Sequence, residues 1–142
     1  MPLPRPSKRA YSLACASVTA LALAACGSTV STSAFKGEEH EVAQGIANLQ
    51  ADATAAEEGK ICQNDLAASV VERLKGRKAC EQAIKEQLTE IDNLELSVHS
   101  IKIDAAAKTA TATVKSTYAG SPKQSTITLA KEGGRWKITG LG

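Results

Sequence analysis

Aromatic side chains are scarce in this chain of 142 residues, which has one Trp, one Phe and two Tyr. A core with so few rings must be filled by Ala, Val, Ile and Leu. The length is enough for one domain and too short for two of ordinary size. No C-x-x-C pair is present, so the chain lacks the local signature of a redox-active dithiol or a zinc site.

An excess of one sign of charge is also lacking once the first 25 residues are set apart. The first 25 residues hold three basic side chains, Arg5, Lys8 and Arg9, and no acid. Without them, 14 basic and 15 acidic side chains remain, so the formal charge changes from +2 to −1. Such a balance provides no basic surface for phosphates, and we expect no nucleic-acid partner.

An uncharged run from Ala10 to Ala25 follows the basic start. Its 16 residues fall short of the roughly 20 that a membrane-spanning helix needs, but they suit the apolar region of a signal peptide. The run ends at Leu23-Ala24-Ala25-Cys26, which resembles the bacterial lipobox. That resemblance implies cleavage before Cys26 and a lipid on its thiol, holding the protein at the extracytoplasmic face of the cell membrane. The alternative is a plain secretory signal in which Cys26 has no role.

These features divide the chain into a lipoprotein signal peptide over residues 1–25, a lipidated Cys26 with a tether over 26–37, and one domain over 38–142. The segment from Gly27 to Gly37 is rich in Ser and Thr, which predicts a flexible tether. Its Phe35 either packs onto the domain or dips toward the lipid, and we expect packing.

The first part of the domain has helical periodicity. An apolar stripe predicts a helix over 38–55, and its members are Val42, Ile46, Leu49 and Ala53. A tight turn or short helix is expected over 59–66, and another helix over 79–92. Between them, Ser69 to Glu72 has the S-x-x-E form of a capping box, and Gly76 suits a C-terminal stop.

Cys62 and Cys80 lie on apolar positions of these helical pieces and remain after processing. An even pair in a chain bound for an oxidising compartment predicts a structural disulfide. The rival interpretation is a redox-active or metal-binding pair, but no His lies near either Cys in the sequence. We therefore expect no metal and no cofactor.

The second part of the domain alternates apolar and polar residues, which predicts four antiparallel strands. They run from Leu94 to Ile103, over 110–118, around 126–129 and around 136–138. The alternation changes phase at His99-Ser100, which predicts a β-bulge in the first strand. Helices followed by strands predict an α+β fold, with the helices packed on one face of a curved antiparallel four-stranded sheet.

This order of elements resembles the NTF2-like superfamily, whose members form a cystatin-like α+β cone. The stretch Leu129 to Ile138 has the pattern L-x-K-x-x-G-x-W-x-I, similar to the end of small bacterial NTF2-like lipoproteins grouped as DUF4878-like domains. The resemblance covers about residues 38–142 and implies a sheet wrapped around a helix, with a pocket at the open end. Trp136, Tyr118 and His99 are the candidate residues of that pocket, and Trp136 is also expected in the core.

Enzymes of this superfamily place Tyr, Asp or His in the pocket. Here no acid–base pair occurs at an interpretable spacing, and Asp52 falls about one residue off the apolar stripe. We therefore expect no catalytic residues and a protein that is not an enzyme.

Three functions remain open on these residues. The first is a non-catalytic, membrane-anchored domain that binds a protein partner or a small apolar ligand. The second is a structural envelope component that assembles through an exposed strand edge. The third is a pocket enzyme, which would need a buried carboxylate or His facing a cavity.

Overall fold

The computed structural model describes residues 30–91, 94–118 and 121–142, except for the Tyr118 side chain. The signal peptide, Cys26 and residues 27–29 of the tether lie outside this part. The helices are α1 (Glu38–Thr54), α2 (Glu58–Lys60), the π-helical turn η1 (Ile61–Asp65), α3 (Ala68–Arg73) and α4 (Arg77–Thr89). The strands are β1 (Glu95–Asp104), β2 (Thr109–Tyr118), β3 (Ser121–Glu132) and β4 (Arg135–Leu141).

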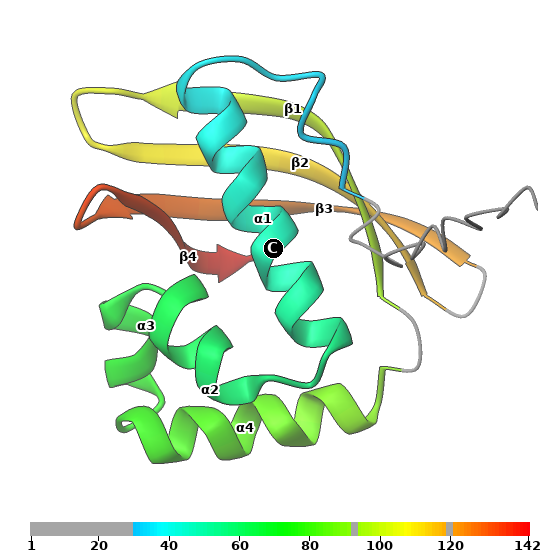
Figure 1. Ribbon diagram of the computed structural model, residues 1–142, viewed down its shortest axis with the longest axis vertical. Coiled ribbons are helices and arrows are strands. Elements are labelled where there is room, and N and C mark those ends of the chain that lie inside the picture. Colours follow the sequence, from blue (N-terminus) through cyan, green and yellow to red (C-terminus); the bar gives the residue numbers. More distant parts are fainter. Residues whose placement is uncertain (1–29, 92–93, 119–120) are drawn as a thin grey trace, which may run out of the picture.

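Within the described residues the four strands form one antiparallel sheet in the order β1-β2-β3-β4, as the alternation predicted. The β1–β2 register shifts between Val98 and Ser100, which puts the predicted bulge at His99. A second shift lies between Thr128 and Leu129, where β3 pairs with β4. Bulges bend and twist a sheet, and this sheet is curved (Figure 1).

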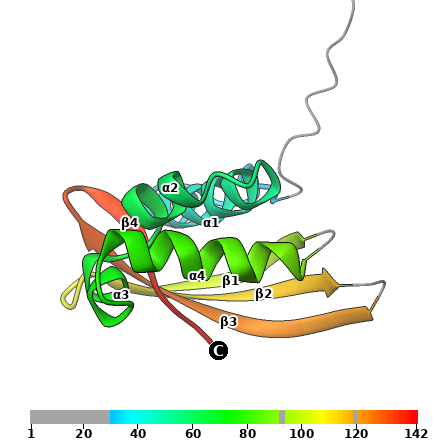
Figure 2. The ribbon, with the colours of Figure 1, turned by 90° about the horizontal axis from the view of Figure 1, so that it is seen from below.

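Helix α1 runs across the sheet toward the short helices and α4 (Figure 1), and α1, α2 and α4 lie on one side of the sheet (Figure 2). The buried apolar residues of α1 pack with the strands in one core. They are Val42, Ala43, Ile46 and Ala47. A Cβ built on Gly45 would lie 2.9 Å from the carbonyl oxygen of Trp136. Gly45 therefore permits a close approach of α1 to β4.

The buried face of α1 differs from the predicted stripe. Leu49 and Ala53 are half-buried, whereas Gln50 is 3% exposed. Gln50 Nε2 donates to the Leu94 carbonyl at 3.1 Å, and its Oε1 accepts from the Leu96 N–H at 3.3 Å. A polar side chain is stable at this buried position because it bonds to the backbone at the start of β1.

The prediction of a capping box at Ser69 to Glu72 is wrong. Ser69 lies inside α3, whose N-cap is Ala67, and no side chain of the cap residue makes a capping bond. The chain is extended up to Ala67, whose N–H donates to the Ile138 carbonyl at 2.8 Å, and α3 starts directly after this residue. The free Ala68 N–H then donates to the Glu132 carboxylate at 3.1 Å, so a distant strand supplies the cap.

The end of α3 has the expected stop, with one change of residue. Lys75, at φ 65°, takes the left-handed position, and the Gly76 N–H donates to the Val71 carbonyl at 2.9 Å. Helix α4 begins at Arg77 and ends at Thr89, whereas the pattern predicted 79–92. Gly76, at φ 100°, serves both the end of α3 and the start of α4.

The described end of the predicted tether is packed against the domain. Val30 is 6% exposed and belongs to the core, and Phe35 is half-buried against it, as expected for Phe35. The prediction of a flexible tether through Gly37 is therefore wrong for its described end, because the folded part of the chain reaches back at least to Val30. In the described part of the chain, no helix is long and apolar enough to cross a membrane.

Candidate functional site

A groove of about 350 Å³ lies between α1, the turn η1 and the β3–β4 hairpin. We call it the α1–β4 groove. Small-molecule sites usually begin at about 300 Å³, so the volume suits a small ligand. Its polar and charged lining residues are His40, Glu41, Gln44, Asn48, Asp52, Asn64, Asp65 and Arg135.

Helix α1 supplies one wall because its polar residues share a face. Glu41, Gln44, Asn48 and Asp52 follow one another at spacings of three and four, which stacks them along one side of a helix. The opposite side of α1 is the buried apolar face. The groove is therefore the polar half of an amphipathic helix, closed by η1 and β4.

The turn η1 carries Asp65 and is fixed against β4. Leu66 bridges to Ile138, and Lys137 Nζ donates to the Gln63 carbonyl at 3.1 Å. These contacts join residues far apart in the sequence and place Asp65 beside the strand that carries Trp136.

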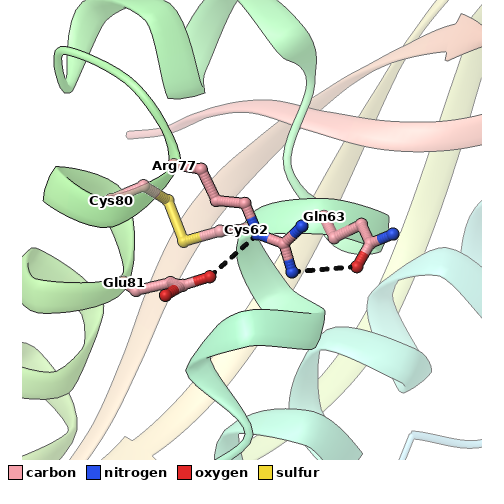
Figure 3. Close-up of polar contacts among 5 residues, drawn as sticks. All are labelled: Cys62, Gln63, Arg77, Cys80 and Glu81. Carbon is pink, nitrogen blue, oxygen red and sulfur yellow. Dashed lines mark hydrogen bonds and ion pairs between the residues drawn. A yellow bond between two sulfur atoms is a disulfide. The ribbon is translucent and has the colours of Figure 1, made fainter.

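A disulfide fixes the other side of η1 to α4, as predicted from the cysteine count. Cys62 and Cys80 are bonded, with their Cα atoms 6.1 Å apart (Figure 3). Beside them, Arg77 donates to Glu81 at 2.9 Å and to the Gln63 side chain at 3.1 Å (Figure 3). The turn that holds Asp65 is thus braced from both β4 and α4.

Asp65 is 5% exposed, and its Oδ2 has no hydrogen-bond partner. Burial, followed by the neighbouring Asp52 carboxyl, raises the pKa of Asp65 to about 7, against a smaller opposing effect of Arg135 and Lys137. Near neutral pH the Asp65 carboxyl is therefore about half protonated and can take up or release a proton.

Trp136 is 6% exposed and lines the same groove. Its Nε1–H has no hydrogen-bond partner, although buried indole N–H groups usually find one. Lys131 Nζ lies 5.6 Å from the ring centroid and also pairs with Glu38 at 2.7 Å and Glu41 at 3.5 Å. Two residues that line the groove thus each carry a buried polar atom without a hydrogen-bond partner.

The structure brings only one of the three predicted pocket residues to this groove. Trp136 lines it, whereas His99 is exposed at the bulge of β1 and is not among the lining residues. Tyr118 ends β2 opposite Ser121, and its side chain lies outside the described residues. Asp65 was missed, although an acid between Cys62 and Leu66, in an apolar and disulfide-bonded turn, was a signal that could have found it.

The lining chemistry limits what the groove can do. Among the lining residues there is no Ser, Thr, Cys or Tyr to act as a nucleophile. In the described ranges no cluster of three or more His, Cys, Asp or Glu side chains could hold a metal ion. The lining offers a ligand three carboxyls, three side-chain amides, an imidazole and a guanidinium, and the Asp65 carboxyl can exchange a proton near neutral pH.

No protein-family model and no curated protein matches this chain. A designed NTF2-like protein of solved structure is similar to it, with 14% identity and a TM-score of 0.51. The match covers 74% of this chain and 97% of that chain. At this identity the likeness concerns the fold, which is an NTF2-like α+β arrangement of helices on a curved four-stranded antiparallel sheet.

Proposed function

We propose that this protein is a lipid-anchored, extracytoplasmic domain that binds a small polar ligand in the α1–β4 groove without catalysing a reaction. One observation carries the proposal: a groove of about 350 Å³ is lined by the polar face of α1 together with polar residues of η1 and β4. Small-molecule sites of this size use a few polar groups to orient their ligand.

The proposed location rests on the sequence. The apolar run ending at Leu23 to Cys26 supports export and lipidation, and the membrane is then a partner through the N-terminal lipid. The Cys62–Cys80 disulfide suits an oxidising compartment. We also propose that the domain is similar to the DUF4878-like bacterial lipoproteins and that it binds no nucleic acid.

The lining of the groove changes the ligand that we propose. The sequence favoured a small apolar ligand or a protein partner. The lining includes three carboxyls and three side-chain amides, and an apolar ligand would desolvate such groups without pairing them, which is unfavourable. A polar ligand that forms hydrogen bonds with the lining fits the groove better.

Proton transfer is a second candidate function, favoured by one observation. The pocket enzyme required a buried carboxylate facing a cavity, and Asp65 is buried on the wall of the groove, with a pKa raised by burial to about 7. A carboxyl of that pKa can act as a general base near neutral pH. We rank binding first because the lining contains no Ser, Thr, Cys or Tyr that could act as a nucleophile beside this carboxyl.

Native mass spectrometry of the mature protein, released from its own envelope, tests the ligand. We expect a retained small molecule in the wild type, and its loss in Ala51→Trp, because Ala51 lines the groove and the larger ring would fill it. Gln87→Trp, on an exposed position of α4, is the matched control and should keep the molecule. A wild type without a bound molecule, or one retained by Ala51→Trp, contradicts the proposal, and turnover of the retained molecule by purified protein would favour proton transfer.

Membrane fractionation tests the anchor. The wild type should sediment with membranes, and Cys26→Ala should move to the soluble extracytoplasmic fraction, because two or more acyl chains are needed for firm anchoring. Cys15→Ala, within the predicted signal segment, is the control and should leave the distribution unchanged. A Cys26→Ala protein that still sediments with membranes would refute the lipid anchor.

A further inference from the structure

The segment from Val30 to Gly37 belongs to the folded domain. Val30 is 6% exposed and lies in the hydrophobic core, and Phe35 is half-buried against that core. The Thr32 carbonyl accepts from the Phe35 N–H at 3.1 Å and from His40 Nδ1 at 3.0 Å, which ties the segment to the start of α1. Val30 is therefore a fixed point of the domain, and the link to a lipid on Cys26 ends there.

That link is short. Residues 27–29 are all that separates Val30 from Cys26 in the sequence. Whatever their conformation, the four Cα–Cα steps from Cys26 to Val30 span at most about 14 Å. A tether running through Gly37 would have allowed about 40 Å. A lipid on Cys26 would thus hold Val30 close to the surface of the bilayer.

The exposed residues that follow Val30 form the surface nearest to this link. We call it the 31–40 surface, and its members are Ser31, Ser33, Ala34, Lys36, Glu38, Glu39 and His40. The blue segment that carries most of them lies in the upper half of Figure 1, whereas α3 and the start of α4 lie at the lower left. In Figure 2 the same two parts are again separated along the molecule. A flat bilayer within reach of Val30 therefore meets the 31–40 surface before it can meet the α3–α4 turn.

We propose that the 31–40 surface is the face that this domain lays on the membrane, with lipid headgroups as its partner. This orientation rests on the proposed lipid at Cys26 and adds to it the face that meets the bilayer. The turn between α3 and α4 then points away from the headgroups. We call this turn the basic turn, after Lys75, Arg77 and Lys78.

Charge alone would select the opposite orientation. Anionic headgroups attract clusters of Lys and Arg, and the basic turn is such a cluster. The 31–40 surface has no positive excess, because Lys36 is outnumbered by Glu38 and Glu39. Contact through the 31–40 surface is therefore imposed by the short link and should not depend on salt, whereas docking through the basic turn should weaken as salt rises.

Paramagnetic broadening in NMR spectra distinguishes the two orientations. We would place the ¹⁵N-labelled, lipidated protein in nanodiscs of anionic phospholipid that contain a small fraction of lipid with a gadolinium chelate on its headgroup. Backbone amide signals of Ser31, Ser33 and Lys36 should lose most of their intensity. Those of Lys75 and Lys78 should keep theirs, and the pattern should be the same at low and at high salt.

Two variants show what sets the orientation. Inserting about twelve Gly and Ser residues between Thr29 and Val30 lengthens the greatest span of the link by about 40 Å, so the selective loss at the 31–40 surface should disappear. Replacing Lys75→Gln and Lys78→Gln together is the matched control, since it removes exposed charge and leaves the link unchanged. This double variant should keep the wild-type pattern.

The orientation and the anchor can fail separately. If the wild type sediments with membranes but all its amides broaden equally, or the basic turn broadens most, the orientation is refuted and the anchor stands. A pattern that fades at high salt, or that survives the inserted linker, also refutes the orientation. If the wild type does not sediment with membranes, the anchor is refuted and the orientation with it.

Discussion

Two polar side chains, Gln50 and Asp65, are buried in the described part of the chain, and their surroundings differ. Gln50 has partners on both sides, the Leu94 carbonyl and the Leu96 N–H, and it ties α1 to β1. Asp65 Oδ2 has no partner, and its carboxyl lines a groove. Buried groups satisfied by the chain stabilise a fold, whereas an unsatisfied one costs stability. Gln50 therefore stabilises the fold, whereas Asp65 costs stability where it lies beside the groove.

The largest expected effect comes from the disulfide, which joins η1, the element that carries Asp65, to α4. Replacing Cys62 and Cys80 together by Ala opens a loop of 18 residues and should cost roughly 3 kcal/mol of unfolding free energy. Urea denaturation of wild type and variant measures this loss.

Hydrogen exchange shows where that loss acts. Amides of η1 and the start of α4 should exchange faster in the double variant, whereas amides of β1 near Gln50 should gain less exchange. Equal acceleration in both regions would show that they are not separate units.

Gln50→Leu is expected to have the next largest effect. The variant keeps a buried apolar volume but loses two hydrogen bonds between α1 and β1, at a cost of about 2 kcal/mol. Because no titrating group is lost, the cost should be the same at pH 5 and pH 8. Gln87→Leu on the exposed side of α4 is the control, and a Gln50→Leu protein as stable as this control would contradict a structural role for Gln50.

Asp65→Asn, in contrast to Gln50→Leu, should raise the free energy of unfolding at alkaline pH. Burial raises the folded-state pKa of Asp65 from 3.8 to about 7, so the folded chain binds this proton more tightly than the unfolded chain. The contribution of this group is fully present below about pH 4 and is lost as the pH rises through 7. The neutral amide avoids that loss, and the variant should be more stable than wild type by roughly 1–2 kcal/mol at pH 8, with little difference at pH 4.

Denaturation of both proteins at several pH values measures this difference. Asp104→Asn, on an exposed turn, should follow the wild type at every pH. A stability difference for Asp65→Asn that does not change between pH 4 and pH 8 would show that Asp65 titrates as an ordinary carboxyl.

Gly45→Ala has the smallest expected effect. The new Cβ would lie 2.9 Å from the Trp136 carbonyl oxygen, so α1 or β4 must shift, and the net cost after the gain in helix propensity is about 1 kcal/mol. Trp fluorescence should report the shift, since Trp136 is the only Trp. Gly59→Ala, where the nearest atom is a Glu81 oxygen at 3.7 Å, should not destabilise, and equal effects of the two changes would contradict the close approach.

Local pattern was enough to predict most of the fold. Alternation along the second part predicted the four-stranded meander and the bulge at His99, because side-chain period fixes which face of a strand is buried. The count of cysteines that remain after processing predicted the Cys62–Cys80 bond.

The candidate site depended on contacts that no local pattern contains. Gln50 is buried because the backbone at the start of β1 meets it, and Asp65 is buried because Leu66 pairs with Ile138 far along the chain. Both residues are polar, so periodicity alone assigns them to the surface. Trp136 was placed in the core by its type, but its free N–H is visible only once α1 and β4 are together.

The most direct measurement is a pH titration of the Asp65 carboxyl by ¹³C NMR. The burial of Asp65 beside the groove predicts an apparent pKa of about 7, because burial and then the neighbouring Asp52 carboxyl raise it. A pKa near the ordinary value of 3.8 would contradict the buried, titrating carboxyl.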